Sequence, residues 1–195
     1  MKTQVDLCAA ESAAFNCPNT LAALNGAAIE NWDVSLVSDF SSLFSGFTSF
    51  NINISGWDVS AGTDFSRMFR SCAAFNQPLG SWDVSQSTTF RQMFQGCTSF
   101  DQPLESWTVS ASTNFEEMFN DCAQFNQPLD GWSVNTGTEF SAMFSGCTVF
   151  NQPLGSWNMT GATGFNEMFK NAAAFNQPIG GWDVSSGSNF NKIFY

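Results

Sequence analysis

The chain of 195 residues has no histidine, one tyrosine and only 6 lysine and arginine residues. Histidine is the side chain most often used as a general acid or base, so its absence removes the commonest basis for catalysis near neutral pH. The basic residues are outnumbered by 17 aspartates and glutamates, which leaves a formal net charge of −11. A chain this acidic has no positive surface to neutralise phosphates, so we expect it to bind neither nucleic acid nor an anionic membrane surface.

Long apolar runs and catalytic motifs are missing too. No stretch reaches the roughly 18 consecutive apolar residues that a membrane-spanning helix needs. The first residues, MKTQVDLCAAESAAF, contain no apolar core, so the given chain shows no intact signal peptide. We find no glycine-rich phosphate loop, no nucleophile beside a base, and no paired carboxylates beyond those that a repeat generates. The sequence therefore predicts no enzyme and no cofactor.

What the sequence has is a strict repeat. Its tryptophans are spaced 25 residues apart without a single insertion or deletion: Trp32, Trp57, Trp82, Trp107, Trp132, Trp157 and Trp182. A fixed period of this length is typical of one supersecondary unit stacked on copies of itself. We expect residues 26–195 to be a solenoid of seven 25-residue repeats, the last incomplete and without an evident C-terminal cap. Residues 1–25 do not follow the pattern, and we interpret them as an N-terminal cap.

Each repeat begins with a segment of the type Leu79-x-x-Trp82-x-Val84. Trp82 and Val84 are two residues apart, which places both on one face of an extended chain. Further on, Phe90, Met93, Phe94 and Cys97 follow the i, i+3, i+4, i+7 spacing of a helical stripe, and Gly96 indicates an early end. The pattern predicts a right-handed α/β repeat solenoid, with short parallel strands on one side and short helices on the other.

An Asn-Gln-Pro turn joins one repeat to the next, and its first position is almost always asparagine. The set of equivalent positions is Asn51, Asn76, Asp101, Asn126, Asn151 and Asn176. Stacked amides in a turn can hydrogen-bond to the backbone and to each other, as in other stacked structures. We expect these side chains to hold the stack together rather than to bind a ligand.

The unit M-F-x-x-C-x-x-F-N-Q-P-L-x-x-W-D-V-S, repeated over residues 27–195, resembles the BspA-like leucine-rich-repeat family of surface proteins. In this chain, tryptophan stands where the leucine-rich-repeat strand pattern has leucine. The resemblance implies a leucine-rich-repeat-like solenoid of parallel strands, and a role in surface adhesion or protein binding. It fixes no catalytic residues. The chain departs from many relatives by carrying phenylalanine in place of methionine at Phe65, Phe90 and their equivalents, which alters packing only.

The candidate binding residues lie on the face opposite Trp82 and Val84, because solenoids commonly bind on their strand side. One set is Asp33, Asp58, Asp83, Thr108, Ser133, Asn158 and Asp183. The other is Ser35, Ser60, Ser85, Ser110, Asn135, Thr160 and Ser185. The alternative is that this face is merely solvated.

The pattern suggests two further classes of ligand, calcium and carbohydrate. Stacked aspartates repel by roughly 1 kcal/mol or less in water. A cation such as Ca²⁺ would relieve this repulsion at Asp33, Asp58 and Asp83, although we assign no metal site. Exposed tryptophans could stack on sugars, but every tryptophan here shares its face with valine or its equivalent, which places the indoles in the core.

The six cysteines fall into two groups. Cys72, Cys97, Cys122 and Cys147 are equivalent positions that Phe47 and Ala172 also occupy, so we expect a reduced, buried set that packs as small apolar residues. Cys8 and Cys17 lie in the expected cap and are candidates for a disulfide, which would indicate an oxidising compartment.

Together these observations favour a non-catalytic recognition module, exposed at the cell surface or extracellular, that binds protein or mediates adhesion through its strand face. One alternative is a structural subunit that packs into a larger assembly through an open C-terminal end. Another is a module that binds matrix carbohydrate or depends on calcium. We expect the partner to be another protein or a second copy of the chain.

Overall fold

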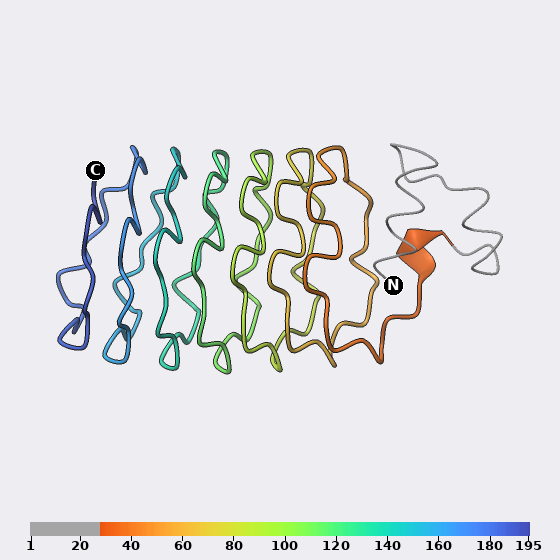
Figure 1. The fold of residues 1–195 in the computed structure, drawn as a ribbon, viewed down its shortest axis with the longest axis horizontal. Coiled ribbons are helices and arrows are strands. Elements are labelled where there is room, and N and C mark those ends of the chain that lie inside the picture. Colours follow the sequence, from red (N-terminus) through yellow and green to blue (C-terminus); the bar gives the residue numbers. More distant parts are fainter. Residues whose placement is uncertain (1–27) are drawn as a thin grey trace.

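The computed structural model describes residues 28–195, and Figure 1 shows them as coils of similar shape stacked side by side along one axis. We call each 25-residue coil a rung and each set of equivalent positions on successive rungs a column. The last rung comprises residues 176–195. In the described part of the chain, the one regular element is the 3₁₀ helix η1, Ile29–Asn31. The predicted N-terminal cap and the pair Cys8 and Cys17 lie outside the described residues.

The predicted α/β solenoid of short strands and short helices is wrong. Apart from η1, residues 28–195 form turns, irregular extended segments and isolated parallel bridges between neighbouring rungs. These bridges join equivalent positions, from Asp39–Asp64 at one end to Gly164–Asn189 at the other. Residues 28–195 are therefore a stack of repeats that, apart from η1, forms neither helices nor continuous strands.

The segment expected to be a helix, Phe90–Cys97, is a run of tight turns. The amides of Met93, Gln95 and Cys97 each donate to a carbonyl three residues earlier, at 2.9–3.2 Å. The amides between them donate instead to the next rung: Phe90 to Asn114, Gln92 to Glu116, Phe94 to Met118 and Gly96 to Asn120. Gln92 has a φ of 58°, and a left-handed residue at this point interrupts any α-helix. The turns nevertheless direct the same apolar stripe inward.

The segment expected to be a strand has no backbone pairing with its neighbours. Between Leu79 and Ser85, no backbone hydrogen bond reaches another rung. Side chains link the rungs here, since the indole nitrogen of each tryptophan from Trp57 onward donates to the carbonyl of the Ile or Leu 28 residues earlier, at 2.9–3.2 Å. Backbone pairing thus lies on the turn side of the stack, opposite to its predicted position.

The core consists of stacked aromatic columns. The rings of Phe69, Phe94 and Phe119 follow one another at 5.6 and 5.7 Å, nearly parallel. Trp107 and Trp132 are 6.4 Å apart and inclined by 2°. These residues are at most 3% exposed, and they can be buried only because each rung covers its neighbour. The predicted burial of the tryptophan, valine and phenylalanine columns in the inner rungs is confirmed.

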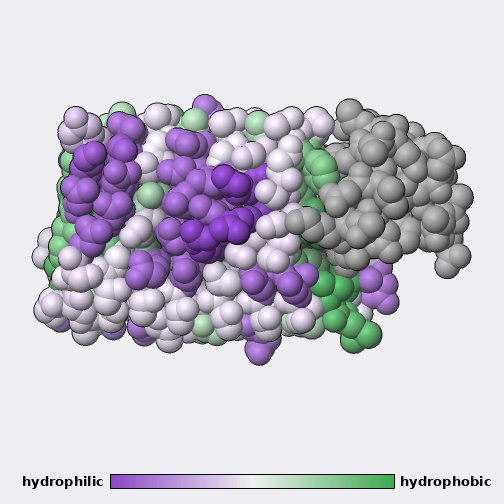
Figure 2. Space-filling view, viewed as in Figure 1, coloured by the Kyte–Doolittle hydropathy of each residue, from purple (hydrophilic) through white to green (hydrophobic). Residues whose placement is uncertain are grey.

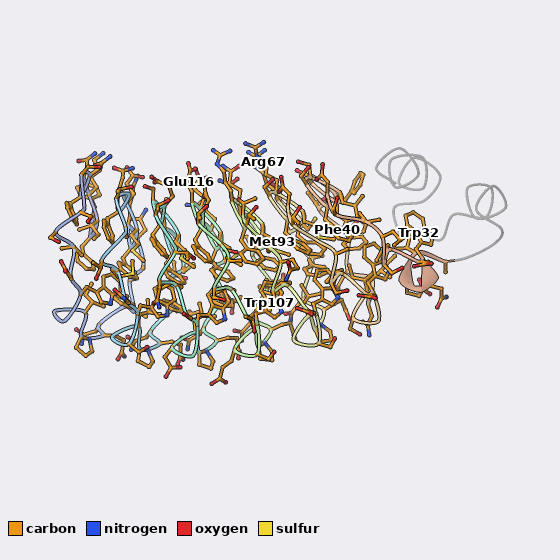
Figure 3. All side chains as sticks on the ribbon, turned by 90° about the horizontal axis from the view of Figure 1, so that it is seen from below. Trp32, Phe40, Arg67, Met93, Trp107 and Glu116 are labelled. Carbon is orange, nitrogen blue, oxygen red and sulfur yellow. The ribbon has the colours of Figure 1, made fainter. Side chains whose placement is uncertain are left out.

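The turn side carries charged and polar side chains, and Figure 3 shows Arg67 and Glu116 along that edge, with Met93 and Trp107 deeper in the stack. Arg91 and Glu116 on adjacent rungs form an ion pair at 2.7 Å. At this degree of exposure such a pair contributes about 1 kcal/mol or less to the free energy of unfolding. Its main effect is therefore on the register of neighbouring rungs.

The asparagine column holds successive rungs together as predicted. The side-chain oxygen of Asn76 accepts hydrogen bonds from the amide of Asp101 at 3.0 Å and from the side chain of Gln102 at 2.9 Å. The same arrangement recurs along the column, from Asn51 to Asn151. These side chains are therefore part of the framework.

Candidate functional site

The structure places all fourteen predicted binding residues on the surface. The column that contains Asp58 and Asp83 is exposed on every rung. In the column of Ser85, the first three members are half-buried and the remaining four are exposed. We call these two columns together the polar face.

On four of the rungs, an aspartate of the polar face forms a turn with the serine two residues later. The Oδ1 atom of Asp58 accepts hydrogen bonds from the backbone amide of Ser60 at 3.1 Å and from its hydroxyl at 2.6 Å. The same backbone bond recurs at Asp33, Asp83 and Asp183, and Asn158 makes both bonds with Thr160. These are Asx turns, which fix the side chain. At the four aspartates they leave the second carboxylate oxygen without a hydrogen bond from the described residues.

The same hydrogen bonds determine the charge of this face. The hydroxyl and then the backbone amide of Ser60 lower the pKa of Asp58 below its ordinary value, and these effects outweigh the opposing effects of desolvation and of the charge of Asp33. Bonds from the following serine lower the pKa values of Asp33, Asp83 and Asp183 in the same way. Hydrogen bonding to the charged form of a carboxyl group stabilises that form. The aspartates of the polar face are therefore ionised at neutral pH.

Within residues 28–195, no group of three or more histidine, cysteine, aspartate or glutamate side chains is placed to hold a metal ion. Each aspartate turns toward its own serine, so Asp33, Asp58 and Asp83 do not converge on one point. Since Ca²⁺ takes six to eight oxygen ligands, the polar face offers it no ready cage.

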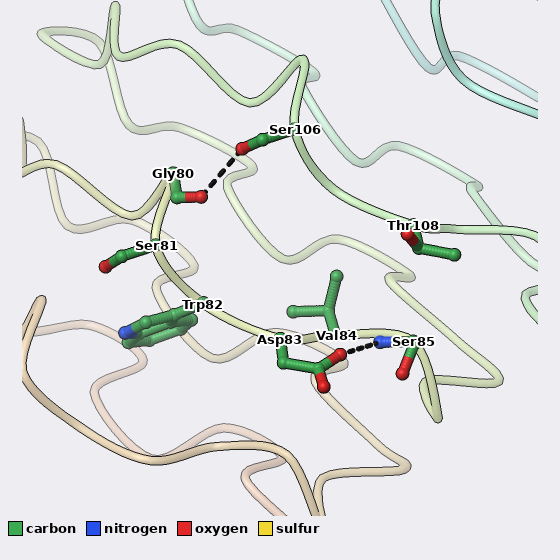
Figure 4. A pocket seen from close by; sticks show the side chains of 8 residues that line it. All are labelled: Gly80, Ser81, Trp82, Asp83, Val84, Ser85, Ser106 and Thr108. Atoms are coloured by element: carbon green, nitrogen blue, oxygen red, sulfur yellow. Dashed lines mark hydrogen bonds between the residues drawn. The ribbon is translucent and has the colours of Figure 1, made fainter.

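A shallow hollow of about 440 Å³ lies on the polar face where two rungs meet (Figure 4). Three predicted residues, Asp83, Ser85 and Thr108, contribute to it. The rest of its lining is Gly80, Ser81, Trp82, Val84 and Ser106. At its edge the hydroxyl of Ser106 donates to the carbonyl oxygen of Gly80 at 2.7 Å. The structure thus brings residues of two rungs together around a polar concavity.

Sequence reasoning did not identify Gly80, Ser81 and Ser106 as part of this hollow. The sequence feature that could have indicated the hollow is the small size of these three residues. A Cβ atom at Gly80 would already lie 3.3 Å from the carbonyl oxygen of Pro103. Trp82 is only 3% exposed, so it offers no platform on which a sugar ring could stack.

The predicted set of reduced, buried cysteines is confirmed. Cys72, Cys97, Cys122 and Cys147 are free and buried, and each thiol donates to a phenylalanine carbonyl 28 residues earlier, at 2.9–3.0 Å. Burial raises the pKa of Cys72 to about 12 and that of Cys97 well above its ordinary value. Thiols in this state are poor nucleophiles and poor metal ligands.

Among the described residues, no helix has the length and apolar character required to cross a membrane. Comparison of the chain with curated proteins gave no match, and neither did comparison with solved structures. One family model matches in two overlapping segments, residues 12–132 and 109–195, as expected of a repeat protein. The matched segments span nearly the whole chain, which therefore belongs to the family described as Mycoplasma protein of unknown function, DUF285.

Proposed function

We propose that this chain is a non-catalytic recognition module that binds a protein partner through its polar face. The observation that carries the proposal is the repeated Asx turn, which presents an ionised carboxylate on three successive rungs, at Asp33, Asp58 and Asp83, and again at Asp183 on the last rung. A surface of this kind is rigid before binding, so little side-chain entropy is lost when a partner docks.

The charge of the face indicates the chemistry of the partner. The polar face carries four ionised aspartates and no basic residue, and the whole chain has a net charge of −11. Complementary potentials accelerate association and select the partner. We therefore propose a partner that presents lysine or arginine side chains at a spacing comparable to that of the rungs.

The proposed location and the proposed role in adhesion rest on the repeat motif. The motif's resemblance to BspA-like surface proteins supports a place at the cell surface or outside the cell, and a role in adhesion. A hydroxyl-rich and weakly charged exterior is consistent with this, since only 12% of the residues are charged.

The test compares two charge reversals of equal size in the full chain. Asp83→Lys alters the polar face, whereas Asp121→Lys alters an exposed aspartate on the turn side. Both variants and the parent are applied to immobilised extracellular matrix proteins of basic, neutral and acidic character, with a glycan array alongside. We expect the parent to bind basic proteins, and Asp83→Lys alone to weaken binding by about tenfold or more. Equal effects of the two variants, or binding to glycans only, would count against the proposal.

A further inference from the structure

The arginines of this acidic chain gather on two adjacent rungs of the turn side. They are Arg67 and Arg70 on one rung and Arg91 on the next, and the sequence has no others. Arg70 is exposed, and the other two are half-buried. In Figure 2 the darkest purple, which marks the most hydrophilic residues, lies in the middle of the stack rather than along its whole length. We call these three residues the arginine patch.

Two of the guanidinium groups are held in place but have no carboxylate partner within residues 28–195. The Nε atom of Arg67 donates to Gln92 at 2.6 Å, and that of Arg70 donates to Gln95 at 2.6 Å. In this part of the chain nothing accepts a hydrogen bond from their terminal Nη atoms, and neither forms an ion pair. Asp64 of the same rung instead accepts from a backbone amide two residues later, at 2.8 Å. The terminal N–H groups of a fixed guanidinium can bind a carboxylate with two parallel hydrogen bonds.

The polar face carries aspartates on the rungs where the turn side carries unpaired basic residues. The two rungs of the arginine patch are also the rungs of Asp58 and Asp83. In the same way, Lys192 is on the rung of Asp183. The remaining basic residue of the described chain, Lys170, is already paired with a glutamate of its own rung at 3.0 Å, and the polar face of that rung is neutral.

Where the turn side is acidic, the polar face is neutral. The rung after the arginine patch carries Glu116, Glu117 and Asp121 on the turn side, and the following rung carries Glu139. On these two rungs, threonine and serine stand at the position of Asp83. The first described rung is the exception, because it carries an aspartate on both sides. From the second rung onward, the charges of the two sides are therefore complementary rung by rung.

These charges can meet only between copies of the chain. Within one copy the segment that bears the polar face lies across the aromatic core from the turn side; Figure 3 shows Arg67 and Glu116 at one edge of the stack, with Trp107 away from that edge. A second copy placed alongside, with its axis parallel and its rungs level, presents Asp58 and Asp83 to the arginine patch. The rung spacing matches because the two stacks are identical. The aspartates are already fixed in Asx turns, so little side-chain entropy is lost on contact.

We propose that copies of this chain associate side by side, with the arginine patch of one copy against Asp58 and Asp83 of the next, their axes parallel and their rungs level. The contact joins two different surfaces, so further copies can add in a row. The inference rests on the proposed function, since it names a second copy as a partner of the polar face. The net charge of −11 opposes association at low ionic strength. At about 0.1 M salt the Debye length is about 10 Å, which screens this overall repulsion more than it screens groups in contact.

The first test compares two charge reversals at equivalent positions of one column. Arg70→Glu alters the arginine patch, whereas Lys170→Glu alters a rung whose polar face is neutral. Sedimentation of the full chain is measured over a range of concentrations in about 0.1 M salt. We expect the parent and Lys170→Glu to associate alike, and Arg70→Glu to require a concentration about tenfold higher or more. A parent that stays monomeric, or equal effects of the two reversals, would overturn the proposal.

A charge exchange between two variants tests the pairing itself. One variant carries Arg67→Glu and Arg70→Glu, and the other carries Asp58→Lys and Asp83→Lys. We expect each to be monomeric alone and an equimolar mixture to associate, because each reversed surface then meets a surface of opposite charge. A mixture that stays monomeric while both variants remain folded would overturn the proposal. Asp58→Asn with Asp83→Asn keeps the Asx turn, as Asn158 does, and should also weaken association, which guards against a folding defect in the second variant.

The result is distinguishable from a failure of the proposed function. A parent chain that binds basic matrix proteins but stays monomeric would refute side-by-side association and leave the proposed function intact. A parent that associates, loses association in Arg70→Glu and binds no basic matrix protein would confirm the inference and restrict the polar face to copies of the same chain.

Discussion

The indole nitrogen of Trp107 donates a hydrogen bond of 2.9 Å to the carbonyl oxygen of Leu79, 28 residues earlier and one rung back. Both residues are buried, and the backbone around them makes no hydrogen bond to a neighbouring rung. The tryptophan column therefore has two roles. Its rings fill the core, and its N–H groups satisfy carbonyls on the side of the stack that lacks backbone pairing.

The first prediction separates these two roles. Trp107→Phe keeps an aromatic ring but removes one of the two hydrogen bonds that the buried carbonyl of Leu79 accepts, the other coming from the amide of Trp82 at 3.0 Å. We expect the loss of this bond to cost about 0.5–1.5 kcal/mol of unfolding free energy. Trp182→Phe removes the equivalent bond on the last rung, where the indole is only half-buried, and should cost less. Guanidinium unfolding of both variants measures the difference. Because both variants lose a hydrogen bond of 2.9 Å, losses of the same size at the two sites would contradict the expected dependence of its contribution on burial.

A second prediction concerns the column of left-handed residues to which Gln92 and Ala142 belong. Ala142 has a φ of 52°, in a conformation that costs a non-glycine residue about 1 kcal/mol. Ala142→Gly should therefore stabilise the protein, and Ala142→Val should destabilise it, as measured by thermal unfolding. Ala123 is not among the left-handed residues, so Ala123→Gly should be destabilising. An unchanged or lower Tm for Ala142→Gly would contradict this account of the turn.

The third prediction is a pH dependence. Because hydrogen bonds lower the pKa of Asp58 in the folded state, they stabilise the fold above the ordinary pKa of 3.8. That contribution is lost as the pH falls through the lowered value. Ser60→Ala should raise the pKa of Asp58, because the hydroxyl of Ser60 is the main cause of the shift. Titration of the carboxyl ¹³C chemical shifts measures the pKa of Asp58 directly, and the carboxyl group of Asp183 serves as an internal control. A titration midpoint of Asp58 that is the same in the parent and in the Ser60→Ala variant would refute the prediction.

The fourth prediction concerns the buried thiols. Their raised pKa values and burial mean that Cys97 and Cys122 are protonated and inaccessible at neutral pH. Iodoacetamide should modify these two at least about 100-fold more slowly in the native protein than in denaturant. Peptide-resolved mass spectrometry gives the rate for each cysteine. Rapid native labelling of Cys122, at the centre of the column, would contradict the packing described.

Much of the packing could be predicted from the sequence. The burial of Trp82, Phe94 and Cys97 followed from their period, and the hydrogen bonds of Asn76 followed from its place in the turn. The exposure of Asp83 and the half-buried position of Ser85 at the surface followed from their alternation with Trp82 and Val84. These features depend on which side a residue faces, and a periodic pattern specifies that directly.

The path of the backbone could not be predicted in the same way. The spacing of Phe90, Met93, Phe94 and Cys97 fits a helix, but a run of three-residue turns satisfies it equally well. The feature that selects the turns is a left-handed residue, and here it is Gln92 or Glu117, without the glycine that usually marks that conformation. The hydrogen bond between Asp58 and Ser60 was also missed, although the Asp-x-Ser spacing is typical of an Asx turn.

The central structural claim is that the segment Phe90–Cys97 is a run of turns bonded to the next rung and not a helix. Identifying the acceptor of the backbone amide of Phe94 tests this claim most directly. An NMR experiment that detects scalar coupling across hydrogen bonds identifies the carbonyl that accepts from this amide. The rung structure predicts coupling from the amide nitrogen of Phe94 to the carbonyl carbon of Met118 on the next rung, joined here at 2.9–3.0 Å like its equivalents on other rungs. Coupling to the carbonyl carbon of Phe90 instead, four residues earlier, would establish an α-helix and contradict the structure.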